Sequence, residues 1–296
     1  MQVSEILKFV QCPECGYVPL VYKEGKINCG NCKSSFEVIE NVPIFLKQEK
    51  LNKQEITQKK WFEKHYSAFP DNEYKLEKWR ESMLNRIFDS SFKNKIKTYL
   101  DIGCGATGYT VIESAKRNGW TSFGIDISIE AMVKAKRNAV RERVDENTAF
   151  LVCSSENIPL QDKKFDYISM VSILEHLEND QKAVQEASRL LNSPGFLFAC
   201  VPNAYLRIWP FLWPFYFYQD FKIGHKRHYS IEDLDGLFNT DFFSRYKFFY
   251  NGHLIKLFQL ILDKFNVIND KKWWEIEKKD INKNSSGLQL NAVYYK

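Results

Sequence analysis

A glycine-rich turn between two short apolar runs restricts the fold of this sequence more than any other feature. Residues 99–102 read as a buried strand, residues 103–108 (Gly-Cys-Gly-Ala-Thr-Gly) follow at once, and a helical pattern continues through Ala115. The next apolar run, residues 122–126, ends in Asp126. Glycines let main-chain N–H groups approach a ligand at the start of a helix, and an acid at the end of the next strand can accept hydrogen bonds from ribose hydroxyls. The pattern predicts an α/β sheet with a nucleotide-binding edge.

Glycine spacing alone does not separate dinucleotide enzymes from other nucleotide-binding folds. Two further features separate them: Asp101, which stands two residues before the first glycine, and a series of later motifs. These motifs are Glu156-Asn157-Ile158-Pro159-Leu160, Lys164-Phe165-Asp166-Tyr167-Ile168, Ile173-Leu174-Glu175-His176-Leu177, Ser188-Arg189-Leu190-Leu191, Pro194-Gly195 and an apolar run at 196–200. In order and spacing, residues 98–202 resemble the ubiquinone- and menaquinone-biosynthesis-like family of class I S-adenosylmethionine-dependent methyltransferases. The resemblance implies S-adenosyl-L-methionine as the cofactor.

The same resemblance assigns contacts at the methionine and ribose end of the cofactor. The residues implied to line this end, and the strand tip beside the reactive methyl, are Asp101, Gly103, Gly105, Val171 and Ser172. Asp126 is implied to take the ribose hydroxyls. We expect Asp101 and Asp126 to face one shared cavity with no side chain between them.

At the adenine end, the resemblance implies that Ile127 packs on the ring and that Ser155 and Glu156 border its edge. One position departs from the family pattern, which usually has an acid at the place of Ser154 to bind the adenine amine. Either Ser154 or Glu156 is expected to substitute for it.

Four of the seven cysteines form two Cys-x-x-Cys pairs near the N-terminus, Cys12 with Cys15 and Cys29 with Cys32. Two residues between thiolates let a tight turn aim both sulfurs at one tetrahedral ion, so the pairs predict a closed, structural zinc site. A redox pair would be expected singly and beside a βαβ unit. So short a segment can hardly build its own core, and we expect the metal to supply most of its folding free energy.

The segment around these cysteines, about residues 9–47, resembles the zinc ribbon of the small activator subunit of tRNA and release-factor methyltransferases. Its closing Val42-Pro43-Ile44-Phe45-Leu46 is a specific part of the match. Such ribbons are often fused to methyltransferases, so the resemblance favours a methyltransferase without naming its acceptor.

Residues 47–64 have few apolar side chains and read as a solvated linker that runs into a helix. Apolar residues then recur at the spacing of helices that lay one face on a core. They are Trp61, Phe62, Tyr66, Leu76, Trp79, Met83, Leu84, Ile87 and Phe88. We interpret these helices as caps. The alternative is that Tyr66 or its neighbours close over the cofactor, as the helix before the core does in many class I methyltransferases.

Methyl transfer requires an aligned nucleophile and, for a hydroxyl acceptor, a base. His176 is the first candidate because it follows the fourth strand, at the edge where ligands gather. The alternative is a histidine that only satisfies a backbone group.

Residues 224–230 resemble the Gly-His-x-Arg-x-Tyr-Ser segment found after the fifth strand in many methyltransferases of glycan and lipid-linked pathways. His225, Arg227 and Tyr229 could bind an anionic or hydroxyl-rich acceptor there, and His225 and Tyr229 join His176 as catalytic candidates. The alternative is that these residues pin an insertion to the core.

Residues 208–218 hold a dense aromatic run that is too short and too interrupted by proline to span a bilayer. We interpret it as a lid packed on the sheet, and the alternative is an apolar acceptor surface at a membrane interface. Apolar residues from Leu254 to Phe265 predict an amphipathic helix between strands at 245–250 and 288–295. Residues 269–286 read as a charged surface excursion.

The composition, 44% apolar and 27% charged, is that of a folded protein. A net charge of +5 is mild and neither requires nor excludes a nucleic-acid partner. The sequence shows no secretory signal pattern and no apolar window long enough to span a membrane, which predicts a cytoplasmic location.

Together these features predict a Rossmann-like α/β fold: a seven-stranded class I methyltransferase sheet, with its last strand antiparallel, preceded by a zinc ribbon. The expected divisions are a ribbon at 1–48, a helical linker and cap at 49–95 and a methyltransferase domain at 96–296. That domain would carry an aromatic insertion at about 203–229 and a helical insertion at about 252–286.

We expect an enzyme that methylates oxygen, or less readily nitrogen, of a small molecule, glycan or lipid-linked intermediate. One alternative is an RNA or protein methyltransferase whose ribbon binds the substrate or a partner. Another is a non-catalytic scaffold, against which the intact acids and glycines argue. Peripheral membrane contact and the oligomeric state stay open.

Overall fold

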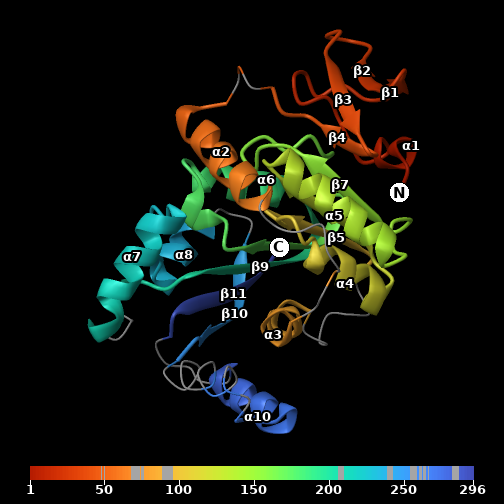
Figure 1. Ribbon diagram of the computed structural model, residues 1–296. Coiled ribbons are helices and arrows are strands. Elements are labelled where there is room, and N and C mark those ends of the chain that lie inside the picture. The colour runs from red at the N-terminus through yellow and green to blue at the C-terminus, as the bar shows by residue number, and fades with distance from the viewer. Residues whose placement is uncertain are drawn as a thin grey trace.

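One continuous sheet with helices on both faces organises the chain (Figure 1). A computed structural model describes residues 1–47, 49, 51–67, 74, 77–88, 96–205, 210–238, 243–253, 259, 262, 265, 267–281 and 287–296. Leu76, residues 208–209 and most of the helix expected over 254–265 lie outside the described residues.

Seven strands form the central part of the sheet, in the order β7, β6, β5, β8, β9, β11, β10. Their bounds are β5 (Thr98–Ile102), β6 (Thr121–Asp126), β7 (Thr148–Val152), β8 (Phe165–Val171), β9 (Leu191–Pro202), β10 (Ser244–Asn251) and β11 (Gln289–Tyr295). β5 to β9 run parallel, whereas β11 pairs antiparallel with both β9 and β10. The predicted seven-stranded sheet with an antiparallel last strand is confirmed.

Helices pack on the two faces because side chains alternate along each strand. Tyr99 joins the apolar cluster under α3, while its neighbour Leu100 joins the cluster under α6 and α8. The helices are α1 (Val3–Ile6), α2 (Lys53–Ser67), α3 (Lys78–Ile87), α4 (Tyr109–Asn118), α5 (Ile129–Arg141), α6 (Asp180–Leu190), α7 (Trp213–Ile223), α8 (Ile231–Phe238) and α10 (Asp270–Ile281). Ser128 caps α5, since its hydroxyl oxygen accepts from Ala131 N at 3.1 Å.

The zinc ribbon continues the central sheet. Its strands, β1 (Leu20–Lys23), β2 (Lys26–Cys29), β3 (Ser35–Ile39) and β4 (Val42–Ile44), pair antiparallel in sequence order. β4 then pairs parallel with β7 through Ile44 and Val152, and Phe45 N donates to the carbonyl oxygen of Val152 at 2.8 Å. The ribbon therefore occupies the β7 edge of the sheet (Figure 1).

The first ten residues cover the sheet face that also carries α6. Residues 153–164, between β7 and β8, form no helix, and the Phe9 ring packs there at 4.7 Å from Phe123. Val3 and Ile6 are buried in the same core. Each fully buried side chain of this size contributes about 1.5 to 3 kcal/mol. The ribbon therefore does not lack a hydrophobic core, because it shares the core of the central sheet, and burial adds to whatever the metal contributes to its folding.

The segment expected as a charged surface excursion, residues 269–286, forms α10 over the part that is described. Most residues of α10 are exposed or half-buried, but Trp273 is 1% exposed and Asp280 is fully buried. The Asp280 carboxylate accepts from the backbone N–H groups of Gly252 and His253 at 2.8 and 2.9 Å. These few buried contacts on a mostly charged helix explain why its sequence reads as exposed.

Candidate active site

The four ribbon cysteines bring their sulfurs together. Cys12 Sγ lies 3.6 Å from Cys32 Sγ, Cys15 Sγ lies 3.6 Å from Cys29 Sγ, and all four lie within 4.8 Å of one another. A tetrahedral zinc ion with Zn–S bonds of about 2.3 Å requires sulfurs about 3.8 Å apart. The donor set fits a closed structural zinc site, which the sequence predicted.

Two adjoining cavities lie at the carboxyl ends of β5, β6 and β8, and together they are lined by every residue predicted to bind the cofactor. Gly103 and Ser172 line both of them. The first cavity is also lined by Asp126, Ile127, Ser155 and Glu156, and the second by Asp101, Gly105 and Val171.

Tyr66 from α2 contributes to both cavities. Its hydroxyl would stand 3.1 Å from a Cβ at Gly105, so its ring lies across their boundary. The expectation of one undivided cavity between Asp101 and Asp126 is therefore wrong. A ligand that reaches both carboxylates requires the Tyr66 side chain to move.

Asp126 is held by the glycine loop and by the start of α5. Its carboxylate accepts from Gly105 N at 3.1 Å and from Ser128 N at 3.0 Å. Burial raises the pKa of Asp126 to about 6, although these backbone hydrogen bonds oppose the shift. Asp126 also lines the first cavity, and each of its carboxylate oxygens accepts only one of these two hydrogen bonds, which leaves a second lone pair on each.

Asp101 is buried more deeply and is bound on both oxygens. Ser169 Oγ donates to Oδ1 at 2.5 Å, and the Thr110 hydroxyl donates to Oδ2. Burial raises the pKa of Asp101 to about 7 against the effect of these two hydroxyls. Asp101 therefore organises the base of the glycine loop.

The glycine loop needs glycine for both space and backbone conformation. Gly103 has φ +80°, and a Cβ there would come within 2.5 Å of Ile173 Cδ1. Gly105 has φ +64° and faces Tyr66. At the end of β8, Ser172 also has a positive φ of 51°, an uncommon conformation for a non-glycine residue and one that often marks a functional site.

The helix α2 covers the first cavity. Glu63 caps α5, accepting from Ile129 N at 2.8 Å and from Glu130 N at 3.3 Å, and the Tyr66 carbonyl accepts from Lys134 Nζ at 2.7 Å. Phe62, Glu55 and Gln58 line the cavity. The sequence suggested Tyr66 and its neighbours as a cover, but Glu55 and Gln58 were missed because their segment reads as a solvated linker.

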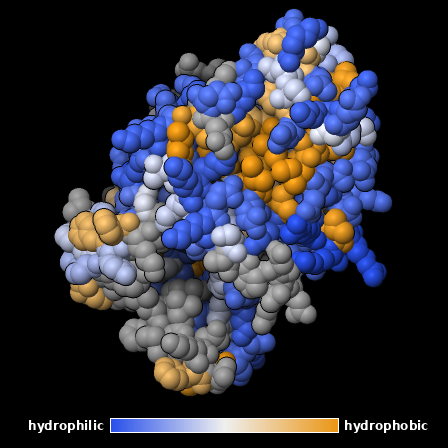
Figure 2. Space-filling view, turned by 45° about the horizontal axis from the view of Figure 1, so that its top comes forward, coloured by the Kyte–Doolittle hydropathy of each residue, from blue (hydrophilic) through white to orange (hydrophobic). Residues whose placement is uncertain are grey.

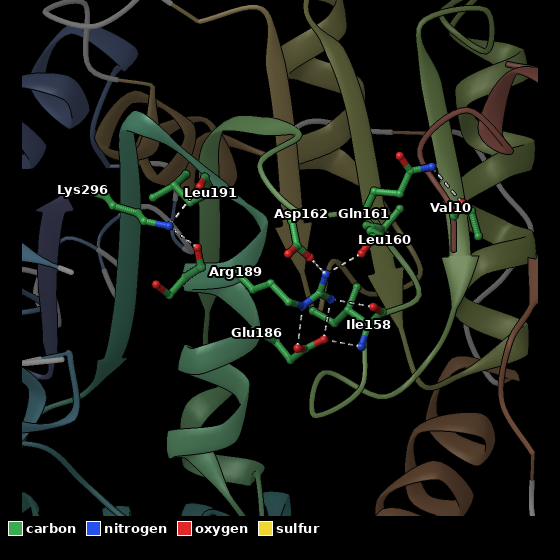
Figure 3. Close-up of polar contacts among 10 residues, drawn as sticks. Val10, Ile158, Leu160, Gln161, Asp162, Glu186, Arg189, Leu191 and Lys296 are labelled. Carbon is green, nitrogen blue, oxygen red and sulfur yellow. Dashed lines mark hydrogen bonds and ion pairs between the residues drawn. The ribbon is translucent and has the colours of Figure 1, made fainter. Parts of the chain in front are cut away.

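The loop that carries Ser155 and Glu156 is tied down on both sides (Figure 3). Arg189 of α6 donates to the carbonyl oxygens of Ile158 and Leu160 at 2.9 and 2.7 Å and pairs with Glu186 and Asp162. On the opposite side, Gln161 Nε2 donates to the Val10 carbonyl at 3.0 Å. The N-terminal segment thus supports one wall of the cofactor cleft.

Next to the cleft, β8 ends in a 3₁₀ turn, Leu174–His176, and His176 lines the first cavity. Its ring packs edge-on against Phe62 of α2, with ring centroids 5.8 Å apart. Burial, with a smaller contribution from His225, lowers the pKa of His176 to about 4, so the imidazole is neutral at pH 7. Burial, reinforced by Asp220, raises the pKa of the adjacent Glu175 to about 8.

His225 does not line the cavity but contacts His176, with ring centroids 4.8 Å apart. Its Nδ1 is hydrogen-bonded to Asp220 Oδ1 at 2.7 Å, and His228 Nε2 is hydrogen-bonded to Asp220 Oδ2 at 2.8 Å. Asp220 is thus the centre of a histidine cluster. The sequence analysis did not identify Asp220 as a site residue, because it lies inside the aromatic insertion at about 203–229.

Tyr229 lies away from the cavity. It is 4% exposed, and its hydroxyl donates to the Leu174 carbonyl at 3.1 Å and to Asp180 Oδ2 at 2.8 Å. Arg227 pairs with the same Asp180 at 2.7 Å. The predicted catalytic role of Tyr229 finds no support in this geometry, which fits the alternative that it pins the loop to the core.

The aromatic segment is not a packed lid where it is described. Apolar side chains gather at the end of the molecule that carries α7, at the left of Figure 2. The exposed fractions are 64% for Phe211, 56% for Phe217, 61% for Tyr218 and 90% for Phe221. Tyr205 stacks on Phe217 and on His228, which links this surface to the histidine cluster. No described helix has the length and apolar character needed to cross a membrane.

Comparison with known proteins agrees with this geometry. Residues 100–199 match the family model described as a methyltransferase domain. Norajmaline N-methyltransferase of Rauvolfia serpentina is 34% identical over 109 residues, which cover 37% of this chain and 36% of that protein. The ubiquinone biosynthesis O-methyltransferase of Glaesserella parasuis serovar 5 is 28% identical over 165 residues, covering 53% and 64%. The chain thus spans between about a third and two thirds of these curated relatives, 36% and 64%.

Among solved structures, geranyl diphosphate C-methyltransferase from Streptomyces coelicolor A3(2) superposes with a TM-score of 0.59 at 12% identity, covering 82% of this chain and 98% of that one. The strand order and the cleft at the strand ends define the class: this is the Rossmann-like fold of class I S-adenosylmethionine-dependent methyltransferases. Residues 100–199 match the methyltransferase domain model, and ubiquinone and menaquinone methyltransferases are among the proteins to which this chain is similar. The resemblance predicted for this part of the sequence is confirmed.

Proposed function

We propose that this chain is an enzyme that transfers the methyl group of S-adenosylmethionine to an oxygen atom of a small molecule, glycan or lipid-linked acceptor. The observation that carries the proposal is the cleft itself, where the predicted cofactor residues meet a buried, neutral histidine, His176. S-adenosylmethionine, when bound, supplies an electrophilic methyl group on a sulfonium.

Each part of the cleft has a role in binding and orientation. The Asp126 carboxylate accepts from the ribose hydroxyls, and the backbone of Gly103 and Gly105 lets the ligand approach closely. The α2 helix covers the cavity and excludes water. Positioning of this kind supplies much of the rate in a reaction that needs only an aligned nucleophile.

His176 is the group best placed to take a proton from an acceptor hydroxyl. It lines the cavity beside Ser172 and Ile173, and it is neutral at pH 7. The relatives named above act on nitrogen, oxygen and carbon, so the acceptor atom has to be inferred from the site. A neutral base beside the cavity favours oxygen, because a hydroxyl must lose its proton during transfer whereas an amine is already nucleophilic.

The test is methyl transfer from labelled S-adenosylmethionine into a small-molecule cell extract. We expect labelled product with the wild-type chain and a loss of about 10²- to 10⁴-fold with His176→Gln, as for removal of a general base. S-adenosylhomocysteine should still bind this variant, which separates catalysis from cofactor binding. His65→Gln, which changes an exposed histidine of α2, is the matched control. Full transfer by His176→Gln would contradict the assigned base.

A further inference from the structure

One turn of α2 places two polar side chains at the same end of the first cavity. Glu55 and Gln58, three residues apart, lie on one helix face and line the cavity together with Ile127 and Ser154. Gln58 Nε2 is buried and has no hydrogen-bond partner among the described residues. A buried donor without a partner is costly, so this amide is suited to a ligand.

Glu55 places a carboxylate beside Ser154 at the end of β7. The resemblance described above implies an acid at the position of Ser154, where this sequence has a serine. In the structure Ser154 Oγ donates to Glu55 Oε1 at 2.5 Å. Glu156 is directed elsewhere, since its Oε1 accepts from Asn179 N at 3.1 Å. Of the two glutamates that line this end of the cavity, Glu55 is the one hydrogen-bonded to the Ser154 side chain.

We infer that α2 recognises the adenine ring of the cofactor: Glu55 accepts a hydrogen bond from the 6-amino group, and Gln58 donates one to a ring nitrogen. This inference rests on the proposed function, because it concerns the ligand of the same cleft. The edge of adenine offers an N–H donor beside a ring acceptor, and an adjacent acceptor and donor are its complement. Ile127, on the same cavity wall, gives the ring an apolar surface.

Helix capping explains part of the geometry of Glu55 but not all of it. Asn52 N donates to Glu55 Oε2 at 2.9 Å, and Glu55 N donates to Asn52 Oδ1 at 2.9 Å, a reciprocal capping box. This cap uses Oε2 and leaves Oε1, with a second lone pair, toward Ser154 and the cavity. Capping also gives no reason for the partnerless amide of Gln58.

The experiment compares two ligands that differ only at the adenine edge. S-adenosylhomocysteine carries a 6-amino group, whereas S-inosylhomocysteine carries a 6-oxo group that would face the Glu55 carboxylate. By calorimetry with the zinc-loaded full chain, we expect the wild type to prefer the adenosyl ligand on the order of tenfold to a hundredfold. Glu55→Gln should bring the ratio of the two affinities close to one, because an amide can hydrogen-bond with either the 6-amino or the 6-oxo group. Thermal unfolding without ligand checks that each variant is folded.

Glu63→Gln is the matched control, because Glu63 lies on the same helix and caps α5 without lining the cavity. It should keep the wild-type ratio. Glu55→Asp, which retains a capping acid but withdraws the carboxylate, is the second variant and should lower the preference. An unchanged ratio in Glu55→Gln and Glu55→Asp, or equal affinities in the wild type, would overturn the inference while leaving the proposed function intact. Failure of the wild type to bind either ligand would overturn the proposed function itself.

Discussion

Asp101 and Asp126 end adjacent strands, but they have different roles. Asp126 lines the first cavity and accepts a hydrogen bond from the glycine loop, whereas both carboxylate oxygens of Asp101 accept hydrogen bonds from Thr110 and Ser169. Burial raises the pKa of Asp126 to about 6 and the pKa of Asp101 to about 7. The ionisation of Asp126 should therefore affect ligand affinity, and the ionisation of Asp101 should affect folding stability.

The affinity for S-adenosylhomocysteine should depend on pH through Asp126. Its pKa is about 6 in the absence of ligand, and the ionised carboxylate is the form that accepts from both ribose hydroxyls. Binding should weaken about tenfold between pH 8 and pH 5, because a proton must be displaced at the lower pH. Asp126→Asn should bind more weakly at pH 8 and change less over this range, as titration calorimetry can measure. Equal pH dependence in the two proteins would be inconsistent with this role.

Folding stability should depend on pH through Asp101. Its pKa is 3.8 when unperturbed and about 7 in the folded chain, so its proton stabilises the fold at low pH and that stabilisation is lost as pH rises through 7. Between pH 5.5 and pH 8 the free energy of unfolding of the wild type, relative to Asp101→Asn, should fall by about 2 kcal/mol. Urea unfolding at both pH values measures the difference. A constant difference would show that Asp101 is ionised throughout.

Among individual residues, the sequence predicted those at the ends of strands and missed those that reach the cleft from α2 and α7. The positions from Asp101 to Ser172 were implied by the resemblance to the ubiquinone- and menaquinone-biosynthesis-like family, and strand and loop order pointed independently to Asp126 and the glycine loop. Glu55 and Asp220 lie in segments whose composition suggests a linker and an aromatic cover. Tyr229 had the right neighbourhood but the wrong orientation, because its hydroxyl is used by Asp180 and Leu174.

Among the elements, α2 has the most direct influence on access to the cleft. It is anchored to α5 through Glu63 and Lys134, and Tyr66 lies across the boundary of the two cavities. Binding a ligand that spans both therefore requires a movement of this side chain.

Tyr66→Ala should join the cavities and speed ligand association. Removing the ring eliminates the movement that must precede binding, while the lost contact should also speed dissociation. Stopped-flow fluorescence with S-adenosylhomocysteine would measure both rates, and we expect each to rise by roughly tenfold, about 1.4 kcal/mol in each barrier. Tyr66→Phe, which keeps the ring, is the control. An unaltered association rate in Tyr66→Ala would mean that Tyr66 is simply part of the wall.

Strands and helices with clear periodicity were predicted closely, whereas α10 was not. The closing strand was expected at 288–295 and is β11 (Gln289–Tyr295). α10 was missed because its buried face consists of Trp273, Glu277 and Asp280, two of which are acidic. Sequence patterns identify apolar faces, and this helix is held partly by hydrogen bonds to a buried carboxylate.

For the molecule as a whole, the ribbon is integral to the α/β fold that carries the cleft. It extends the sheet through β4, and its N-terminal residues fill the face beside α6. The knuckle at Cys12 and Cys15 lies close to Ile158 and Arg189, which hold the loop of the cofactor cleft. This arrangement gives less support to the alternative in which the ribbon serves chiefly to bind an RNA or protein substrate.

Loss of the metal should therefore destabilise the whole chain and not only the ribbon. Cys29→Ser removes a buried ligand and should lower the midpoint of a single thermal transition by roughly 10 °C or more. Differential scanning calorimetry of the two proteins, with bound zinc determined by elemental analysis, provides the measurement. A separate low-temperature transition that leaves the main one unmoved would show that the ribbon folds independently.

The overall fold class could be predicted from the sequence because the order of motifs fixes the order of strands. The docking of the ribbon could not, since it depends on a single parallel pairing at Ile44 and on apolar residues at the extreme N-terminus. Neither the pairing at Ile44 nor the packing of the N-terminal apolar residues has a local sequence pattern that predicts which part of the sheet it contacts.

The cleft between the β5 and β6 ends should bind an adenosyl ligand. Titration of the zinc-loaded full chain with S-adenosylhomocysteine at pH 8 is the most direct test. We expect one ligand per chain with micromolar or tighter affinity, weakened at least about tenfold by Asp126→Asn, the loss of one charge-assisted hydrogen bond. No binding to the folded, zinc-loaded protein, or binding that Asp126→Asn leaves unchanged, would contradict it.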